Sequence, residues 1–224
     1  ARTIEIPPTL LITGLAIVPE LSHAVTMDAK RPGSALLYVT GADPATHHGL
    51  RGSHYAKRFD IAGLRTDEGA LADCFPRADL ARGPATARAV AELISRSGQD
   101  PIAGCRVHAA HDISDGGLLV SLAEMLIAGS SPEAPLGASI AFQGAGACEL
   151  FAEAPSSYLL EIDSPEGDEA RNTLLSHFES VGAMARIIGE TSATGTLTLV
   201  QGRGEGFQLS VEEMARVWRS ALDW

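Results

Sequence analysis

Two aspartates and two adjacent glycines stand together in the segment DISDGG, which runs from Asp112 to Gly117 between two apolar runs. Glycines at the start of a helix let an anion approach exposed backbone N–H groups and the positive end of the helix dipole. A carboxylate beside a phosphate is repulsive unless a cation lies between them, so Asp112 or Asp115 could hold Mg²⁺. The segment therefore predicts a phosphate site, with Ser114, Gly116 and Gly117 as further candidate contacts.

The same residues also have an interpretation that needs no ligand. Asp115 could cap the helix that follows, which stabilises a helix by about 1 kcal/mol, and the glycines would only let the chain reverse. Local residue types favour this capped turn, because short glycine motifs are common in chains that bind nothing there. From these six residues alone, both interpretations stay open.

A second candidate phosphate contact lies in the segment LRGSHY, where Gly52 precedes the hydroxyl of Ser53. Its alternative is a serine turn that enters a helix. Further along, Glu153 precedes a predicted strand, and we interpret it as a surface or capping charge. Neither segment indicates a phosphate site as strongly as DISDGG does.

No catalytic residue is assigned from the sequence. His108 and His111 are three residues apart in a predicted strand, where they would face opposite sides, so they predict no metal pair. The sequence contains no P-loop, and the GRGEG segment near the C-terminus lacks the spacing of a dinucleotide-binding fingerprint. Nucleotide binding is therefore predicted without a nucleophile or base.

Strand and helix patterns are interleaved, which predicts an α+β fold with a mixed, largely antiparallel sheet covered by helices. A tight turn at Thr194-Gly195 predicts that the strands on either side of it pair with each other, and glycines 202, 204 and 206 predict a flexible turn. Ser210 is expected to cap the last helix. The predicted strands cover residues 10–18, 35–39, 107–111, 138–142, 158–162, 183–189 and 196–201, and the predicted helices cover 84–97, 117–128, 146–151, 165–180 and 211–222.

Residues 1–32 are expected to stand apart from the remainder of the chain. They hold one apolar strand and a polar arm, which is too little to form a core. We predict that they are the end of a preceding domain or an arm that pairs elsewhere, and that residues 33–224 form the α+β domain.

Composition and charge limit the possible partners. Asp and Glu outnumber Lys and Arg by 28 to 17, giving a net charge of −11, and the sequence shows no basic stripe. Binding to nucleic acid or to an anionic membrane is therefore not expected. The apolar run at residues 9–18 falls short of the about 20 residues that a membrane span needs. Three widely spaced cysteines predict neither a disulfide framework nor a zinc site, and they fit the reducing cytoplasm.

Four segments together resemble a known enzyme family: IPPTLLITGLAIVPELSHAVTMDAKRPG, LRGSHY, HDISDGGLLVSLAEM and LFAEAPSSYLLEI. They are similar to the second aminoimidazole-ribonucleotide-synthetase-like half of the phosphoribosylformylglycinamidine synthase family, and the order and spacing hold over essentially the whole chain. DISDGG itself recurs in a wider superfamily that includes aminoimidazole ribonucleotide synthetase, selenophosphate synthetase and thiamine-monophosphate kinase. One departure is Arg51, where the family usually has glycine.

The resemblance implies an ATP- and Mg²⁺-dependent ligase of purine biosynthesis that converts formylglycinamide ribonucleotide to formylglycinamidine ribonucleotide. Ammonia would come from glutamine through a glutaminase domain or subunit. In this family each half joins a β-rich N-terminal domain to an α+β C-terminal domain, so we expect this chain to be the latter, preceded by the tail of the former at residues 1–32. We expect the chain to be inactive alone and to supply one wall of a catalytic or auxiliary nucleotide-phosphate site.

Two alternatives are kept beside this expectation. The chain could belong to another ATP-using member of the superfamily, or it could be a non-catalytic structural domain in which DISDGG only caps a helix. The resemblance carries the phosphate role to a set of residues that match the family element and to two in the serine loop: Asp112, Ser114, Asp115, Gly116, Gly117, Gly52 and Ser53.

Overall fold

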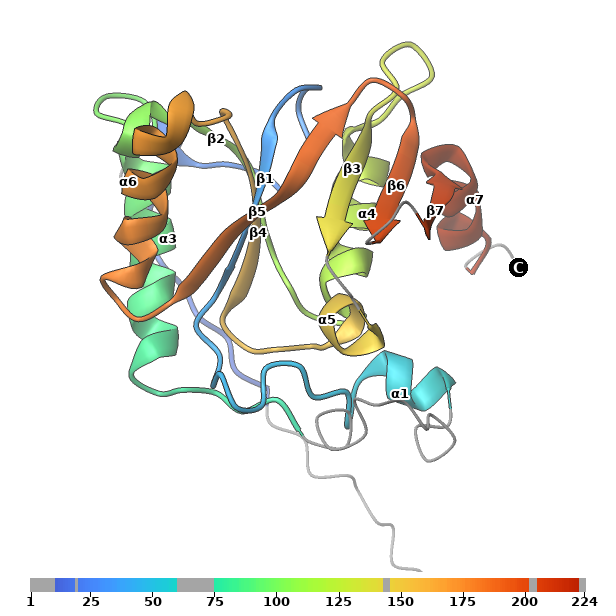
Figure 1. The fold of residues 1–224 in the computed structure, drawn as a ribbon, viewed down its shortest axis with the longest axis horizontal. Helices are drawn as coiled ribbons and strands as arrows, with labels where there is room; N and C mark the ends of the chain where they lie inside the picture. The colour runs from blue at the N-terminus through green and yellow to red at the C-terminus, as the bar shows by residue number, and fades with distance from the viewer. Residues whose placement is uncertain (1–10, 19, 60–74, 143–145, 202–204, 222–224) are drawn as a thin grey trace, which may run out of the picture.

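The computed structural model describes residues 11–18, 20–59, 75–142, 146–201 and 205–221 of the chain (Figure 1). The strands are β1 (Ala35–Thr40), β2 (Val107–Asp112), β3 (Gly137–Phe142), β4 (Ser157–Ile162), β5 (Met184–Ser192), β6 (Thr196–Gln201) and β7 (Glu205–Ser210). The α-helices are α1 (His54–Arg58), α3 (Arg82–Arg96), α4 (Gly117–Gly129), α5 (Ala147–Phe151), α6 (Gly167–Glu179) and α7 (Val211–Ser220). Two short 3₁₀ helices, Leu21–His23 and Ile102–Gly104, complete the described elements.

The seven strands form one sheet in the order β2-β4-β1-β5-β3-β6-β7. Neighbouring strands are antiparallel except β3 and β6, which run parallel. The predicted α+β class with a mixed, largely antiparallel sheet is confirmed.

Helices cover both faces of the sheet, so the domain has three layers (Figure 1). Strand β1 shows how the sequence builds them, because successive side chains of a strand point to opposite faces. Leu37 and Val39 pack in the core under α3 and α6. Leu36 and Tyr38 pack in the other core, under α4. A central strand that is buried on both faces reads as a continuous apolar run, as ALLYV does.

Helix α4 lies at the centre of its layer and follows DISDGG directly. Leu118, Leu122, Met125 and Leu126 are fully or almost fully buried, as its apolar sequence predicts. The backbone of Ala29 runs against its last residue, Gly129, and the Ala29 N–H donates to the Met125 carbonyl. In the part of the chain that the structure describes, no helix is long and apolar enough to cross a membrane.

One predicted connection near the C-terminus is wrong. The strands before and after Thr194-Gly195 do not pair with each other, because β3 lies between β5 and β6. The close fit of β3 against β5 depends on Gly189, where a Cβ would lie 2.0 Å from the Ser139 carbonyl oxygen. Of the predicted flexible turn at glycines 202, 204 and 206, residues 202–204 lie outside the described residues, and Gly206 belongs to β7, an edge strand that pairs with β6. Gly206 permits that pairing, because a Cβ there would lie 1.8 Å from the Leu199 oxygen. The Ser210 cap is confirmed: its Oγ accepts from the Glu213 N–H.

The predicted strand at residues 10–18 is not formed in its described part, residues 11–18. Leu11, Leu15 and Ile17 are 87%, 100% and 91% exposed. A strand needs a hydrogen-bonded neighbour, and these residues pair with no strand within the described chain. The division at residue 32 stays a prediction.

Helix α3 begins beside a carboxylate whose charge depends on pH. The Asp79 carboxylate accepts the backbone N–H groups of Arg82 and Ala81, at 2.8 Å and 3.0 Å, and these bonds lower the pKa of Asp79. A carboxyl with a lowered pKa contributes stability that is present above its unfolded pKa of about 4 and is lost as the pH falls through its folded value.

We therefore expect the free energy of unfolding of the natural chain to exceed that of Asp79→Ala above about pH 4, and the difference to shrink as the pH falls further. Urea unfolding at a series of pH values measures it. Asp79→Asn keeps an acceptor oxygen that does not titrate, so its difference from Asp79→Ala should stay constant. A pH-independent difference between the natural chain and Asp79→Ala would contradict the assignment.

Candidate functional site

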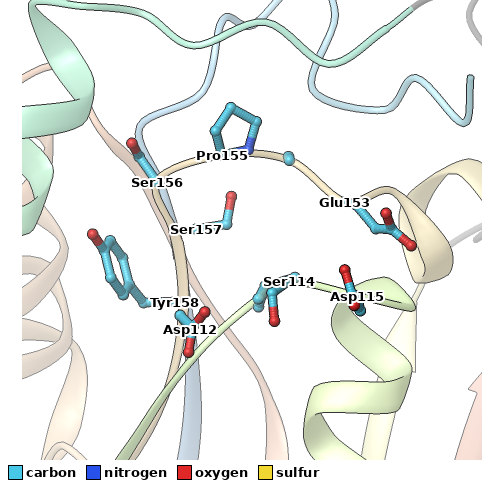
Figure 2. Close-up of a pocket in the computed structure, with 10 residues that line it drawn as sticks. Asp112, Ser114, Asp115, Glu153, Pro155, Ser156, Ser157 and Tyr158 are labelled. Atoms are coloured by element: carbon cyan, nitrogen blue, oxygen red, sulfur yellow. The ribbon is translucent and has the colours of Figure 1, made fainter. Parts of the chain in front are cut away.

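A pocket of about 480 Å³ opens where β2 ends and β4 begins. These strands are neighbours in the sheet, and the Ile113 N–H donates to the Ser157 carbonyl at 2.9 Å, which holds the two segments together. One wall is therefore the DISD part of the sequence motif, and the other is the connection from α5 into β4 (Figure 2). The lining residues are Asp112, Ile113, Ser114, Asp115, Glu153, Ala154, Pro155, Ser156, Ser157 and Tyr158.

The turn into α4 requires both glycines. Gly116 and Gly117 have φ angles of +83° and +74°, in the left-handed region that favours glycine. At Gly117 a Cβ would also lie 2.6 Å from the carbonyl carbon of Phe151. The helix begins at Gly117 with Gly116 as its cap residue, and no side chain of the cap residue bonds to the helix. The interpretation of Asp115 as the helix cap is therefore wrong, because the left-handed turn places the cap one residue later.

Glu153, which is distant from α4 in the sequence, has the capping role instead. Its Oε1 accepts the backbone N–H of Gly116 at 2.8 Å and that of His54, the first residue of α1, at 2.7 Å. The interpretation of Glu153 as a capping charge is thus supported, and this carboxylate joins the starts of α1 and α4. The Gly117 N–H donates to the Ser114 carbonyl at 3.0 Å. Both glycine N–H groups therefore have partners within the protein, and an anion at Gly116 would compete with Glu153.

Asp115 and Glu153 lie on the same side of the pocket, at the start of α4 (Figure 2). The Asp115 side chain is 84% exposed, and its Oδ1 lies 3.8 Å from Nδ1 of His54. The same His54 nitrogen lies 3.1 Å from Oε1 of Glu153. Among the described residues, His54, Asp115 and Glu153 form the one group of three side chains close enough together to hold a metal ion.

Asp112 lies at the other end of the pocket, beside Tyr158 (Figure 2). Its Oδ1 is 3.3 Å from Nδ1 of His111, and the other ring nitrogen of His111 is 3.0 Å from Oε2 of Glu124 in α4. His108 instead contacts Asp163, so the two histidines of β2 have separate partners, as their spacing predicts. Asp112, whose carboxylate contacts His111, therefore lies apart from the group around Asp115.

Gly52 and Ser53 do not line the pocket. The Ser53 hydroxyl is buried, donates to the Leu50 carbonyl at 2.6 Å and accepts the Ala56 N–H at 3.1 Å. This is the serine turn into a helix that the alternative interpretation predicts. Arg51 places its guanidinium 5.2 Å from the centre of the Phe75 ring. The loop reaches the site through His54, which the sequence did not single out.

The pocket is acidic, because three carboxylates and no lysine, arginine or histidine are among its lining residues. Burial, together with the negative charge of Asp112, raises the pKa of Tyr158 above its ordinary value. The Tyr158 hydroxyl therefore stays a neutral donor near pH 7. Such a lining suits a cation, and a phosphate would need a cation between itself and the carboxylates. Ser156 has a φ of +57°, so its part of the wall is held in a strained conformation.

Comparisons with known proteins agree over most of the chain. Residues 31–201 match a family model described as "AIR synthase related protein, C-terminal domain". The matched region contains the sheet from β1 to β6, helices α1 to α6 and every residue that lines the pocket.

Curated relatives match nearly the whole chain. A phosphoribosylformylglycinamidine synthase subunit PurL from Thermus thermophilus is 31% identical over 218 residues, 97% of this chain and 26% of the relative. The subunit of the same name from Rhodospirillum rubrum is 33% identical over 196 residues, 87% of this chain and 23% of the relative. The chain thus spans about a quarter of the length of these relatives.

Solved structures share the fold. Thermotoga maritima PurL in complex with FGAR superposes with a TM-score of 0.61 and 16% identity, over 86% of this chain and 29% of that one. The same protein in complex with ATP gives a TM-score of 0.55 and 15% identity, over 86% of this chain and 27% of that one.

Proposed function

The chain belongs to the family of AIR synthase related protein C-terminal domains, and on that premise we propose that it is the α+β C-terminal domain of one half of a phosphoribosylformylglycinamidine synthase. The whole enzyme would use ATP and ammonia to convert formylglycinamide ribonucleotide to formylglycinamidine ribonucleotide in purine biosynthesis. The observation that carries this proposal is the position of DISDGG, whose first four residues form one wall of a pocket of about 480 Å³.

In this proposal the pocket is one wall of a nucleotide-phosphate site, with Asp112, Ser114 and Asp115 among its lining residues. Gly116 and Gly117 act indirectly, because their left-handed conformations turn the chain so that α4 starts behind the pocket. Mg²⁺ fits the donor set, since carboxylate and hydroxyl oxygens are the ligands that it prefers. Asp112 or Asp115, which lie at opposite ends of the pocket, would hold Mg²⁺, which supplies the positive charge that a phosphate needs beside three carboxylates. Gly52 and Ser53 would support the site by placing α1.

The proposed partners are a preceding β-rich domain and a glutaminase domain or subunit that supplies ammonia. Residues 1–32 would be the tail of the β-rich domain. The exposed apolar side chains of Leu11, Leu15 and Ile17 support this, because such a segment is stabilised by pairing with a sheet that buries them. Cys105 is a buried free thiol, which suits a reducing compartment such as the cytoplasm.

A second candidate is a non-catalytic structural domain. The contact of Glu153 with the Gly116 N–H favours it, because the motif is then satisfied within the protein. A third, another ATP-using member of the superfamily, would share the fold but act on a different substrate.

We expect the 224-residue chain alone to give no turnover of formylglycinamide ribonucleotide with ATP and ammonia. A polypeptide that joins it to the preceding domains of the enzyme should catalyse the ammonia-dependent reaction. Measurement of ADP release with and without the substrate tests both expectations. Turnover by the chain alone would contradict the proposal that it is one domain of the enzyme, and a joined polypeptide that ignores this substrate would favour the other superfamily members.

A further inference from the structure

We propose that His54, Asp115 and Glu153 form a binding site for a divalent cation of the first transition row, with Mn²⁺ as its representative. The site lies at the start of α4, on the edge of the pocket. It is a different ligand set from the two aspartates that the sequence singles out, with Asp115 common to both. The inference rests on the proposed function only in the role of the ion, which would attract the phosphate of a nucleotide into an acidic pocket.

The separations of the three side chains fit one ion. Their ligand atoms all lie within 4.8 Å of one another, with Nδ1 of His54 3.1 Å from Oε1 of Glu153 and 3.8 Å from Oδ1 of Asp115. Two atoms bound to the same ion at about 2.1 Å are about 3.0–4.2 Å apart, depending on the angle between them. The three ligands can therefore bind with rotation of side chains alone.

Glu153 is already held in place for this role. The backbone N–H groups of Gly116 and His54 both donate to its Oε1, which fixes the position of the carboxylate. Carboxylates that bind metals are commonly oriented by such hydrogen bonds. The Glu153 side chain is 18% exposed, whereas His54 and Asp115 are largely exposed and free to close on an ion from the solvent side.

The ligand types select the class of ion. One imidazole and two carboxylates suit Mn²⁺, Fe²⁺, Co²⁺ or Zn²⁺ better than Mg²⁺, which prefers oxygen ligands. Three protein ligands leave further positions open to water or to an oxygen of a phosphate. The ion would also offset the repulsion among the carboxylates at the start of α4 and add to the positive potential of the helix dipole.

The test is the binding of Mn²⁺ alone to the 224-residue chain, followed by electron paramagnetic resonance with detection of coupling to ¹⁴N. The natural chain should bind one Mn²⁺ and show the coupling of one imidazole nitrogen. His54→Gln should lose that coupling, and both His54→Gln and Asp115→Asn should bind Mn²⁺ about tenfold more weakly or worse. The matched controls His23→Gln and Asp100→Asn lie outside the cluster and should bind as the natural chain does.

Three results would overturn the proposal: no Mn²⁺ binding at millimolar concentration, a nitrogen coupling that persists in His54→Gln, or an affinity that is equal in the cluster variants and the controls. Because the titration contains no nucleotide, it can fail independently of the proposed function. If the chain binds Mn²⁺ but a polypeptide that joins it to its preceding domain has no affinity for Mg-ADP, the metal site is supported and the nucleotide site is contradicted. If the joined polypeptide binds Mg-ADP but the chain does not bind Mn²⁺, the nucleotide site is supported and the metal site is contradicted.

Discussion

Replacing Gly117 by alanine is expected to lower the free energy of unfolding by about 4 kcal/mol. Two effects add at this position. The left-handed φ of +74° is unfavourable for alanine, and the new Cβ would lie 2.6 Å from the backbone of Phe151, which cannot move without shifting α5. Because α5 leads into the wall that contains Glu153, the displacement should also open the pocket. Urea unfolding of the natural and variant chains measures the loss.

Gly167 provides a matched control for this prediction. Its φ is +82°, but a Cβ there would meet nothing within 4 Å. Gly167→Ala therefore isolates backbone strain and should cost about 1–2 kcal/mol. If Gly117→Ala costs no more than Gly167→Ala, the close contact between the start of α4 and Phe151 is not as described.

Replacing Glu153 by alanine is expected to destabilise the chain by about 3 kcal/mol, because two backbone donors lose a charged acceptor at once. The N–H groups of Gly116 and His54 would be left without their partner, and the starts of α1 and α4 would no longer be joined. Amide hydrogen exchange should accelerate at these two residues and through the short α1. Exchange measured residue by residue, together with urea unfolding, checks the effect.

Glu153→Gln separates the hydrogen bonds from the charge. Glutamine keeps an oxygen that can accept both N–H groups but lacks the negative charge at the helix start, so it should cost about 1 kcal/mol. Equal losses for the alanine and glutamine variants would show that the charge alone matters. No loss in either variant would contradict the capping role.

The sequence predicts those parts of the fold that depend on local pattern. The apolar run of β1, the strand β4 and the largely apolar α4 each lie within a few residues of the predicted bounds, because neighbouring residues determine which faces of an element can be buried. The Ser210 cap is likewise a local signal. The interleaved patterns also predicted the class of the sheet, but not the order of its strands.

The strand order could not be derived locally. The turn at Thr194-Gly195 is typical of paired neighbours, yet β3 inserts between β5 and β6 because close backbone approach at Gly189 and Gly137 permits it. In the sequence, such a contact between distant residues is marked only by a glycine. Glycines also occur for many other reasons, so the contact cannot be inferred from them. The apolar run at residues 11–18 predicted a strand, but the described chain provides no neighbouring strand with which it could pair.

The candidate site shows the same limit. DISDGG drew attention to the end of β2 where the pocket lies, but the partner of Gly116 is a glutamate 37 residues away, and that glutamate also holds His54, 99 residues from it in the chain. One signal was present: Glu153 directly precedes the β4 connection and is one of few carboxylates near a strand start. Nothing in the spacing placed His54 beside it.

The most direct test of the central claim is calorimetric titration of Mg-ADP into a polypeptide that joins this chain to its preceding domain, in the natural form and as Asp115→Ala. If the pocket at the end of β2 is one wall of a nucleotide-phosphate site, the variant should bind Mg-ADP about tenfold more weakly or worse, which is about 1.4 kcal/mol. Asp100→Ala, an exposed aspartate outside the pocket, should bind as the natural protein does. Equal affinity of Asp115→Ala and the natural protein would contradict the account and leave DISDGG as a structural turn.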